Sequence, residues 1–109
     1  IMTPVTAGHK VTYAIAYLDK VGNPMLTPPT LDGPPSWSEA QSAPGIDTLT
    51  VAPDGNSAVV QTNPGDAAST DTVSVSVSVG GVTFNASDVV TISVAPQELG
   101  SITLVGTVQ

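Results

Sequence analysis

The fold is decided by residues 71–95, DTVSVSVSVGGVTFNASDVVTISVA, which have the sequence pattern of a β-hairpin. From residue 73 to residue 79 every second position is valine and serine fills the positions between, a period of two that is typical of a half-buried β-strand. The glycine pair at 80–81 supplies two residues that adopt positive φ, as a tight hairpin requires. Val82 and Phe84 resume the alternation, so we expect them to face the last valines of the first strand. One face of this hairpin is therefore apolar, and a second sheet has to cover it.

The composition favours an all-β domain. Apolar residues make up 40% of the 109 residues but aromatic residues only 4%, and the ten glycines and ten prolines lie where they interrupt short apolar runs. No stretch shows the apolar periodicity of a helix. A chain of this length can build one hydrophobic core and is too short for two.

The charge balance excludes several classes of partner. Nine acidic residues stand against two lysines and no arginine, which gives a net charge of −7. Binding to nucleic acid or to an anionic membrane needs a cationic surface, and this chain has none to offer. The absence of cysteine excludes disulfides and thiolate metal sites, and no apolar run reaches membrane-spanning length. We therefore expect neither nucleic-acid binding nor membrane insertion.

Further strands are predicted wherever an alternating run lies between turn residues. These are residues 1–7, with Pro4 indicating an edge strand, residues 10–18, a segment around Trp37, residues 46–52 and residues 57–62. The proline-rich residues 25–35 are predicted to be irregular. Together with the hairpin this makes about seven antiparallel strands with turns roughly every ten residues, the spacing of a β-sandwich.

The predicted core combines the inward-facing residues of these strands with the single tryptophan as a plug between the sheets. Its members are Trp37, Tyr13, Ile15, Tyr17, Val73, Val75, Val77, Val79, Phe84 and Ile92. If the alternation of inward and outward side chains continued unbroken from Val82, Asp88 would also face inward. An unpaired buried carboxylate is costly. We therefore expect a β-bulge at residues 85–88 that resets the strand.

Four segments together resemble the bacterial Ig-like (Big-type) domains found on bacterial surface proteins and in tailed-phage virion proteins. These are DKVGNPM at 19–25, PSWS at 35–38, TVSVSVSVGG at 72–81 and VTFNASDVVTISV at 82–94. The resemblance covers most of residues 5–95. It implies an Ig-like β-sandwich in which residues 11–18 form strand B, Trp37 lies on strand C, and the hairpin supplies strands F and G.

An apolar segment follows the predicted sandwich. We expect residues 1–97 to form the domain and residues 98–109 to be a C-terminal extension with strand-like character, including Ile102, Leu104 and Val108. In the Ig-like family such a segment resembles the first strand of a following module. It could fold back on its own sheet edge, be left over from a tandem array, or add to the edge of a neighbouring subunit, where these three residues would contact the partner.

No residue pattern indicates a catalytic site. His9 is the only histidine and is expected on the surface, so a hydrolytic triad has no support. Most aspartates lie in predicted turns, where the side chain caps its own backbone, and we assign no catalytic, cofactor-binding or metal-binding residue and no cofactor. Calcium binding in the loops around Asp19 and Asp54 is left open because the hard oxygens there lack an EF-hand spacing.

These observations predict a non-enzymatic structural or adhesive module. The resemblance to bacterial Ig-like domains implies an extracellular, cell-surface or virion assembly. We expect the module to act there through contacts of its loops and edge strands with protein neighbours in a homo- or hetero-oligomer. The alternative is a carbohydrate- or cell-surface-binding module in which Trp37, Tyr13 or Tyr17 would be platforms for the sugar rings of surface glycans.

Overall fold

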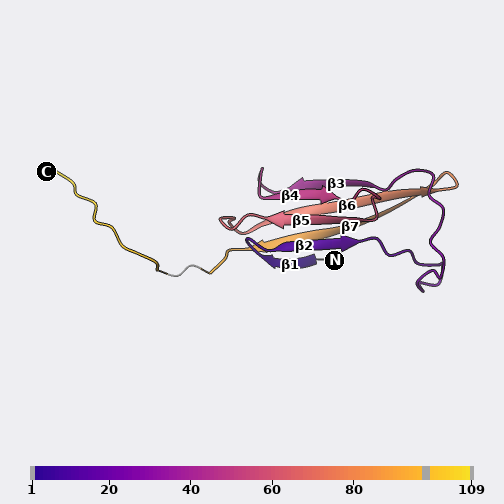
Figure 1. The fold of residues 1–109 in the computed structure, drawn as a ribbon, viewed down its shortest axis with the longest axis horizontal. Coiled ribbons are helices and arrows are strands. Elements are labelled where there is room, and N and C mark those ends of the chain that lie inside the picture. Colours follow the sequence, from indigo (N-terminus) through magenta and orange to yellow (C-terminus); the bar gives the residue numbers. More distant parts are fainter. Residues whose placement is uncertain (1, 97–98, 109) are drawn as a thin grey trace.

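The computed structural model describes residues 2–96 and 99–108, and within this part the chain forms seven β-strands and no helix (Figure 1). The strands are β1 (Met2–Thr6), β2 (Lys10–Ala14), β3 (Ser36–Gln41), β4 (Asp47–Val51), β5 (Ser57–Thr62), β6 (Ser69–Val79) and β7 (Val82–Ser93). The predicted all-β class and the seven strands are confirmed. The described residues contain no helix long and apolar enough to cross a membrane. The predicted domain boundary at 97–98 lies outside the described residues.

The strands form two sheets that enclose one core, as a β-sandwich does. One sheet has the order β1-β7-β6-β3 and the other has the order β2-β5-β4. β1 lies at an edge, in agreement with the position of Pro4, but it pairs with β7 in parallel rather than antiparallel orientation. The two strands come from distant parts of the chain, so no tight turn constrains them to run in opposite directions.

The long hairpin forms as predicted. β6 and β7 pair antiparallel along their whole length, with Val79 opposite Val82 and Val77 opposite Phe84. Gly80 has a φ of 56° and Gly81 a φ of 80°, so the turn uses the left-handed conformations that glycine tolerates.

The buried core lies at the end of the sandwich away from the hairpin turn. Val73, Val90 and Ile92 of the hairpin pack there against Val60 of β5, so the core joins the two sheets. Other members are Ala7 and Ile46, with Val5, Val11, Tyr13, Trp37, Leu49 and Ala95 packed around them. The core predictions for Val73 and Ile92 are confirmed, and Tyr13 and Trp37 contribute as partly buried side chains.

The half of the hairpin that lies nearer its turn is covered by the opposite sheet less completely than predicted. Phe84 was predicted in the core, but 56% of its surface is exposed. β2, β4 and β5 have only five or six residues each, against eleven and twelve in β6 and β7, so their sheet ends before the hairpin does. For the same reason the remaining predicted core residues are only half-buried; these are Ile15, Tyr17, Val75, Val77 and Val79.

The predicted bulge in β7 does not form. Pairing with β6 continues without interruption through residues 85–88, and Asp88 lies opposite Val73. Its Oδ2 accepts hydrogen bonds from the hydroxyl groups of Thr3 and Tyr13, each at 2.5 Å. Burial, the largest single cause, acts to raise the pKa of Asp88, but these two hydrogen bonds and further favourable contacts, including one with the backbone of Val89, together lower it. The prediction was wrong because the carboxylate has partners from β1 and β2.

Candidate functional site

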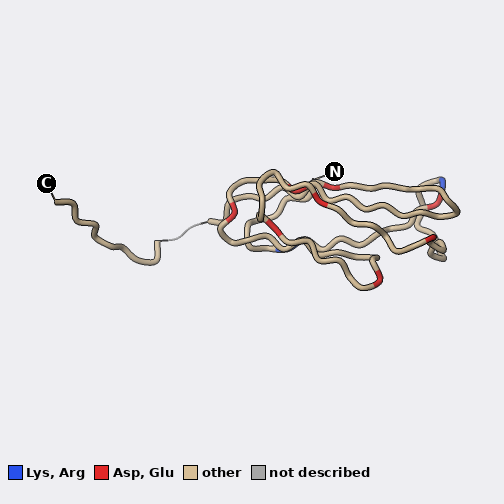
Figure 2. Tube along the Cα trace, turned by 90° about the horizontal axis from the view of Figure 1, so that it is seen from above, with Lys and Arg blue, Asp and Glu red and all other residues tan. Residues whose placement is uncertain are grey.

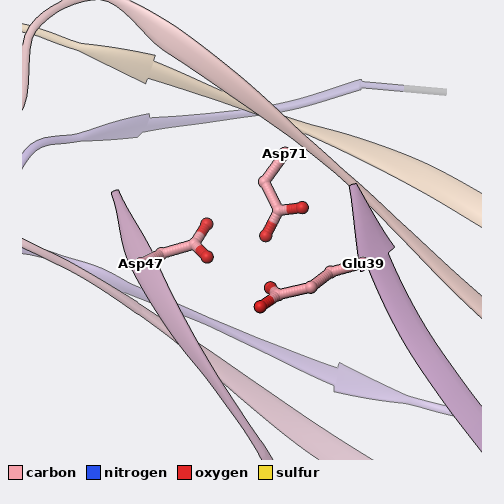
Figure 3. Close-up of side chains that lie close together, drawn as sticks. All are labelled: Glu39, Asp47 and Asp71. Atoms are coloured by element: carbon pink, nitrogen blue, oxygen red, sulfur yellow. The ribbon is translucent and has the colours of Figure 1, made fainter. Parts of the chain in front are cut away.

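Three acidic side chains from three strands meet between the sheets (Figure 3). They are Glu39 of β3, Asp47 at the start of β4 and Asp71 of β6, and one carboxylate oxygen of each lies within 4.8 Å of the others. Below we call these three residues the carboxylate cluster.

Strand pairing and alternation explain how the carboxylate cluster forms. Asp71 lies two residues before Val73 and so shares its core-facing side of β6, and Asp47 is related in the same way to Leu49 on β4. β3 pairs antiparallel with β6, which places Gln41 opposite Asp71 and Glu39 opposite Val73. The short connection at 42–46 then carries the chain to the other sheet, so that β4 begins at Asp47.

The two aspartates of the carboxylate cluster are buried and short of hydrogen-bond donors, whereas Glu39 is exposed. Asp71 is 0% exposed and Asp47 is 5% exposed. Neither oxygen of the Asp71 carboxylate has a hydrogen-bond partner, and Asp47 Oδ2 has none either. Gln41 provides the donor that is present, because its Nε2 donates to Asp47 Oδ1 at 2.8 Å and to Glu39 Oε1 at 3.1 Å. This one neutral amide therefore serves buried Asp47 and exposed Glu39, and it leaves buried Asp71 without a donor.

This environment disfavours the ionised form of both aspartates. Burial is the largest cause of the shift for each and raises the pKa of Asp47 and of Asp71 to about 6. Part of this rise comes from the neighbouring carboxylates, because Asp71 raises the pKa of Asp47 and Glu39 raises that of Asp71. The molecule offers little positive charge to offset this, since its basic positions are sparse (Figure 2).

A second feature is an open apolar cleft of about 780 Å³ beside the incompletely covered half of the hairpin. One wall consists of inward-facing hairpin residues, among them Val77, Val79 and Phe84. The other wall comes from the segment after β2, where Tyr17 and Met25 line the cleft. The predicted core residues of this region thus line a cleft that is open to solvent.

The C-terminal segment does not form the predicted strand. Residues 99–108 contain no strand pairing, and the three predicted partner-contact residues Ile102, Leu104 and Val108 are 80%, 98% and 99% exposed. Of the three arrangements considered for this segment, folding back onto the edge of its own sheet is thus not what the structure shows. The segment leaves the sandwich beyond β7, at the end opposite the hairpin turn (Figure 1).

The loop aspartates considered for calcium cap their own turns. Asp19 Oδ1 accepts hydrogen bonds from the backbone N–H groups of Val21 and Asn23, both at 3.0 Å. Asp54 Oδ1 accepts one from the N–H of Asn56 at 2.9 Å. His9 is exposed, as predicted. The residues that do gather, those of the carboxylate cluster, were not singled out from the sequence.

The aromatic residues considered as sugar platforms are mostly engaged in the fold. Trp37 packs against the core and donates a hydrogen bond from Nε1 to the carbonyl oxygen of Gly55 at 2.8 Å. Tyr13 also packs against the core and binds Asp88. Only Tyr17 lines the cleft.

The chain was also compared with known proteins. No model of a protein family matches it, and no curated protein matches it.

Proposed function

We propose that this protein is a non-enzymatic structural module, an Ig-like β-sandwich that works in an extracellular or virion assembly by joining end to end with another copy of itself. The contact lies between the apolar cleft of one copy and residues 99–108 of the next. The observation that carries the proposal is the exposed apolar surface at the two ends of the sandwich. The sequence resemblance to bacterial Ig-like domains supports the setting.

The cleft supplies one half of this contact. Its lining is mainly apolar and includes exposed or half-buried Leu18, Met25 and Phe84. Monomeric proteins rarely expose contiguous apolar surface of this kind, and where they do it commonly marks an interaction site. The volume of about 780 Å³ lies in the range of pockets that hold a ligand, so it can admit several aliphatic side chains.

The C-terminal segment supplies the other half. Leu99, Ile102, Leu104, Val105 and Val108 are all highly exposed, and Ile102 and Leu104 alternate with threonine and serine as in a strand with one apolar face. Transfer of such side chains from water into an apolar cleft contributes about 1.5–3 kcal/mol for each one fully buried.

The positions of the two halves favour a chain of molecules. The cleft lies along the half of the hairpin near its turn, whereas the C-terminal segment follows β7 at the opposite end. A contact between two different surfaces of identical molecules is heterologous, and it produces a filament unless the rotation closes a ring. A repeating structural subunit would use this arrangement.

Light scattering at increasing protein concentration tests the proposal. We expect the mass of the full chain to rise above that of the monomer, and a chain without residues 99–109 to remain monomeric. Phe84→Ser in the cleft should reduce association in the same way. Leu26→Ser is the matched control, because Leu26 is fully exposed and does not line the cleft. An unchanged mass distribution after the deletion would refute the proposed contact.

A further inference from the structure

We propose that the carboxylate cluster of Glu39, Asp47 and Asp71 binds one hard divalent cation, with calcium as the best match. This inference concerns a different part of the molecule from the end-to-end contact. The test of calcium binding is therefore independent of the test of end-to-end association.

The buried oxygens of Asp71 are the first reason. Both lack a hydrogen-bond partner although the side chain is entirely buried, and Figure 3 shows the carboxylate directed toward Asp47 and Glu39. Buried carboxylates are normally paired with a charge, hydrogen-bonded or bound to a metal. A cation between the three side chains would satisfy these oxygens and the free Oδ2 of Asp47 together.

The chemistry and spacing of the donors are the second reason. Every ligand group is a carboxylate, and hard cations such as calcium and magnesium prefer oxygen ligands. Calcium binds oxygen at about 2.4 Å, so two ligands on opposite sides of it lie about 4.8 Å apart, whereas magnesium requires a closer octahedral shell. The cluster oxygens lie within 4.8 Å of one another, close enough for one ion of the size of calcium to contact all three side chains.

The location gives such a site a structural consequence. Glu39 and Asp71 belong to the four-stranded sheet and Asp47 to the three-stranded sheet, so the cation would connect the two sheets. Because the folded arrangement assembles ligands from distant parts of the chain, binding would stabilise the folded state.

Isothermal titration of the chelator-treated full chain with calcium chloride, at slightly alkaline pH, tests this proposal. We expect one calcium per chain, with a Kd of about 10⁻⁴–10⁻³ M, as in extracellular calcium modules. Saturating calcium should raise the Tm by roughly 10 °C. Magnesium should bind at least about tenfold more weakly, because its octahedral shell is smaller.

Variants locate the binding site. Glu39→Gln should weaken calcium binding at least about tenfold, and because Glu39 is exposed this change should leave folding intact. Asp71→Asn should abolish binding. Asp54→Asn is the control, since it removes the same charge from a turn while keeping a hydrogen-bond acceptor. The proposal is overturned if the wild-type chain binds no calcium, or if Glu39→Gln and Asp54→Asn bind it equally well.

Discussion

Gly55 shows at the scale of a single residue how closely the connections of this sandwich approach one another. Its φ is +76°, and a Cβ atom placed on it would lie 2.9 Å from Cδ of Pro35. Its carbonyl oxygen also accepts the hydrogen bond from Trp37. A glycine here allows the turn after β4 to lie against the start of β3.

Gly55→Ala is therefore expected to lower the free energy of unfolding by roughly 2–4 kcal/mol, from the strained φ and the contact with Pro35. Gly45→Ala is the matched control. Gly45 has nearly the same φ, +75°, but nothing lies within 4 Å of its Cβ position, so only the conformational cost of about 1 kcal/mol remains. Urea unfolding measures the loss of stability in both variants. Equal losses in the two variants would show that the contact with Pro35 contributes nothing.

At the scale of an element, the turn of the long hairpin is held by a residue far away in the sequence. Asp32 Oδ1 accepts a hydrogen bond from the N–H of Gly80 at 3.0 Å, and its Oδ2 accepts one from Gly81 at 2.8 Å. The N–H of Asp32 in turn donates to the carbonyl oxygen of Ser78. The irregular proline-rich segment is thus anchored on the turn between β6 and β7.

Asp32→Ala should increase the amide hydrogen-exchange rates of Gly80 and Gly81 and cost about 1 kcal/mol of stability, because both N–H groups lose a charged acceptor. Asp32→Asn keeps one acceptor oxygen and should fall between the wild type and the alanine variant. Amide exchange followed by NMR is the direct measurement. Unchanged protection of the two glycines in the alanine variant would contradict the anchoring role.

The same hairpin shows what local sequence can predict. The valine–serine alternation and the glycine pair correctly predicted strand direction, register and turn, because these depend on neighbouring residues. The exposure of Phe84 could not be read from the hairpin, because it depends on how far the opposite sheet extends. Asp88 was likewise misjudged, since its partners Thr3 and Tyr13 lie 85 and 75 residues away.

The carboxylate cluster was only partly accessible to sequence analysis. Asp71 lies in phase with the core-facing valines of β6, so its inward orientation was visible in the alternation. Its convergence with Glu39 and Asp47 was not visible, because those residues come from two other strands, and one of the strands lies in the opposite sheet.

At the scale of the whole molecule, the buried aspartates determine how stability varies with pH. The folded-state pKa values of Asp47 and Asp71, about 6, lie above those of unfolded aspartate, so the folded state binds protons more strongly. The stabilisation of the folded state by this proton binding is fully present below the pKa of unfolded aspartate. It is lost as the pH rises through the folded-state pKa of about 6. The lowered pKa of Asp88 acts in the opposite sense, but at more acidic pH.

Calcium-free protein should therefore be less stable at about pH 7 than at about pH 5, by on the order of 2 kcal/mol. Urea unfolding across this range in the presence of a chelator gives the measurement. Asp71→Asn should flatten the dependence, because it removes one of the two titrating groups. A wild-type stability that rises with pH over the same interval would contradict the assignment.

The central claim is that copies associate through the cleft and residues 99–108, and interchain cross-linking tests it most directly. The chain has no cysteine, so one thiol can be placed in each of two samples, Phe84→Cys and Leu104→Cys, which are mixed and mildly oxidised. The account predicts that a disulfide-linked heterodimer forms far faster than in a mixture of Leu26→Cys with Leu104→Cys. Equal rates of cross-linking in the two mixtures would contradict it.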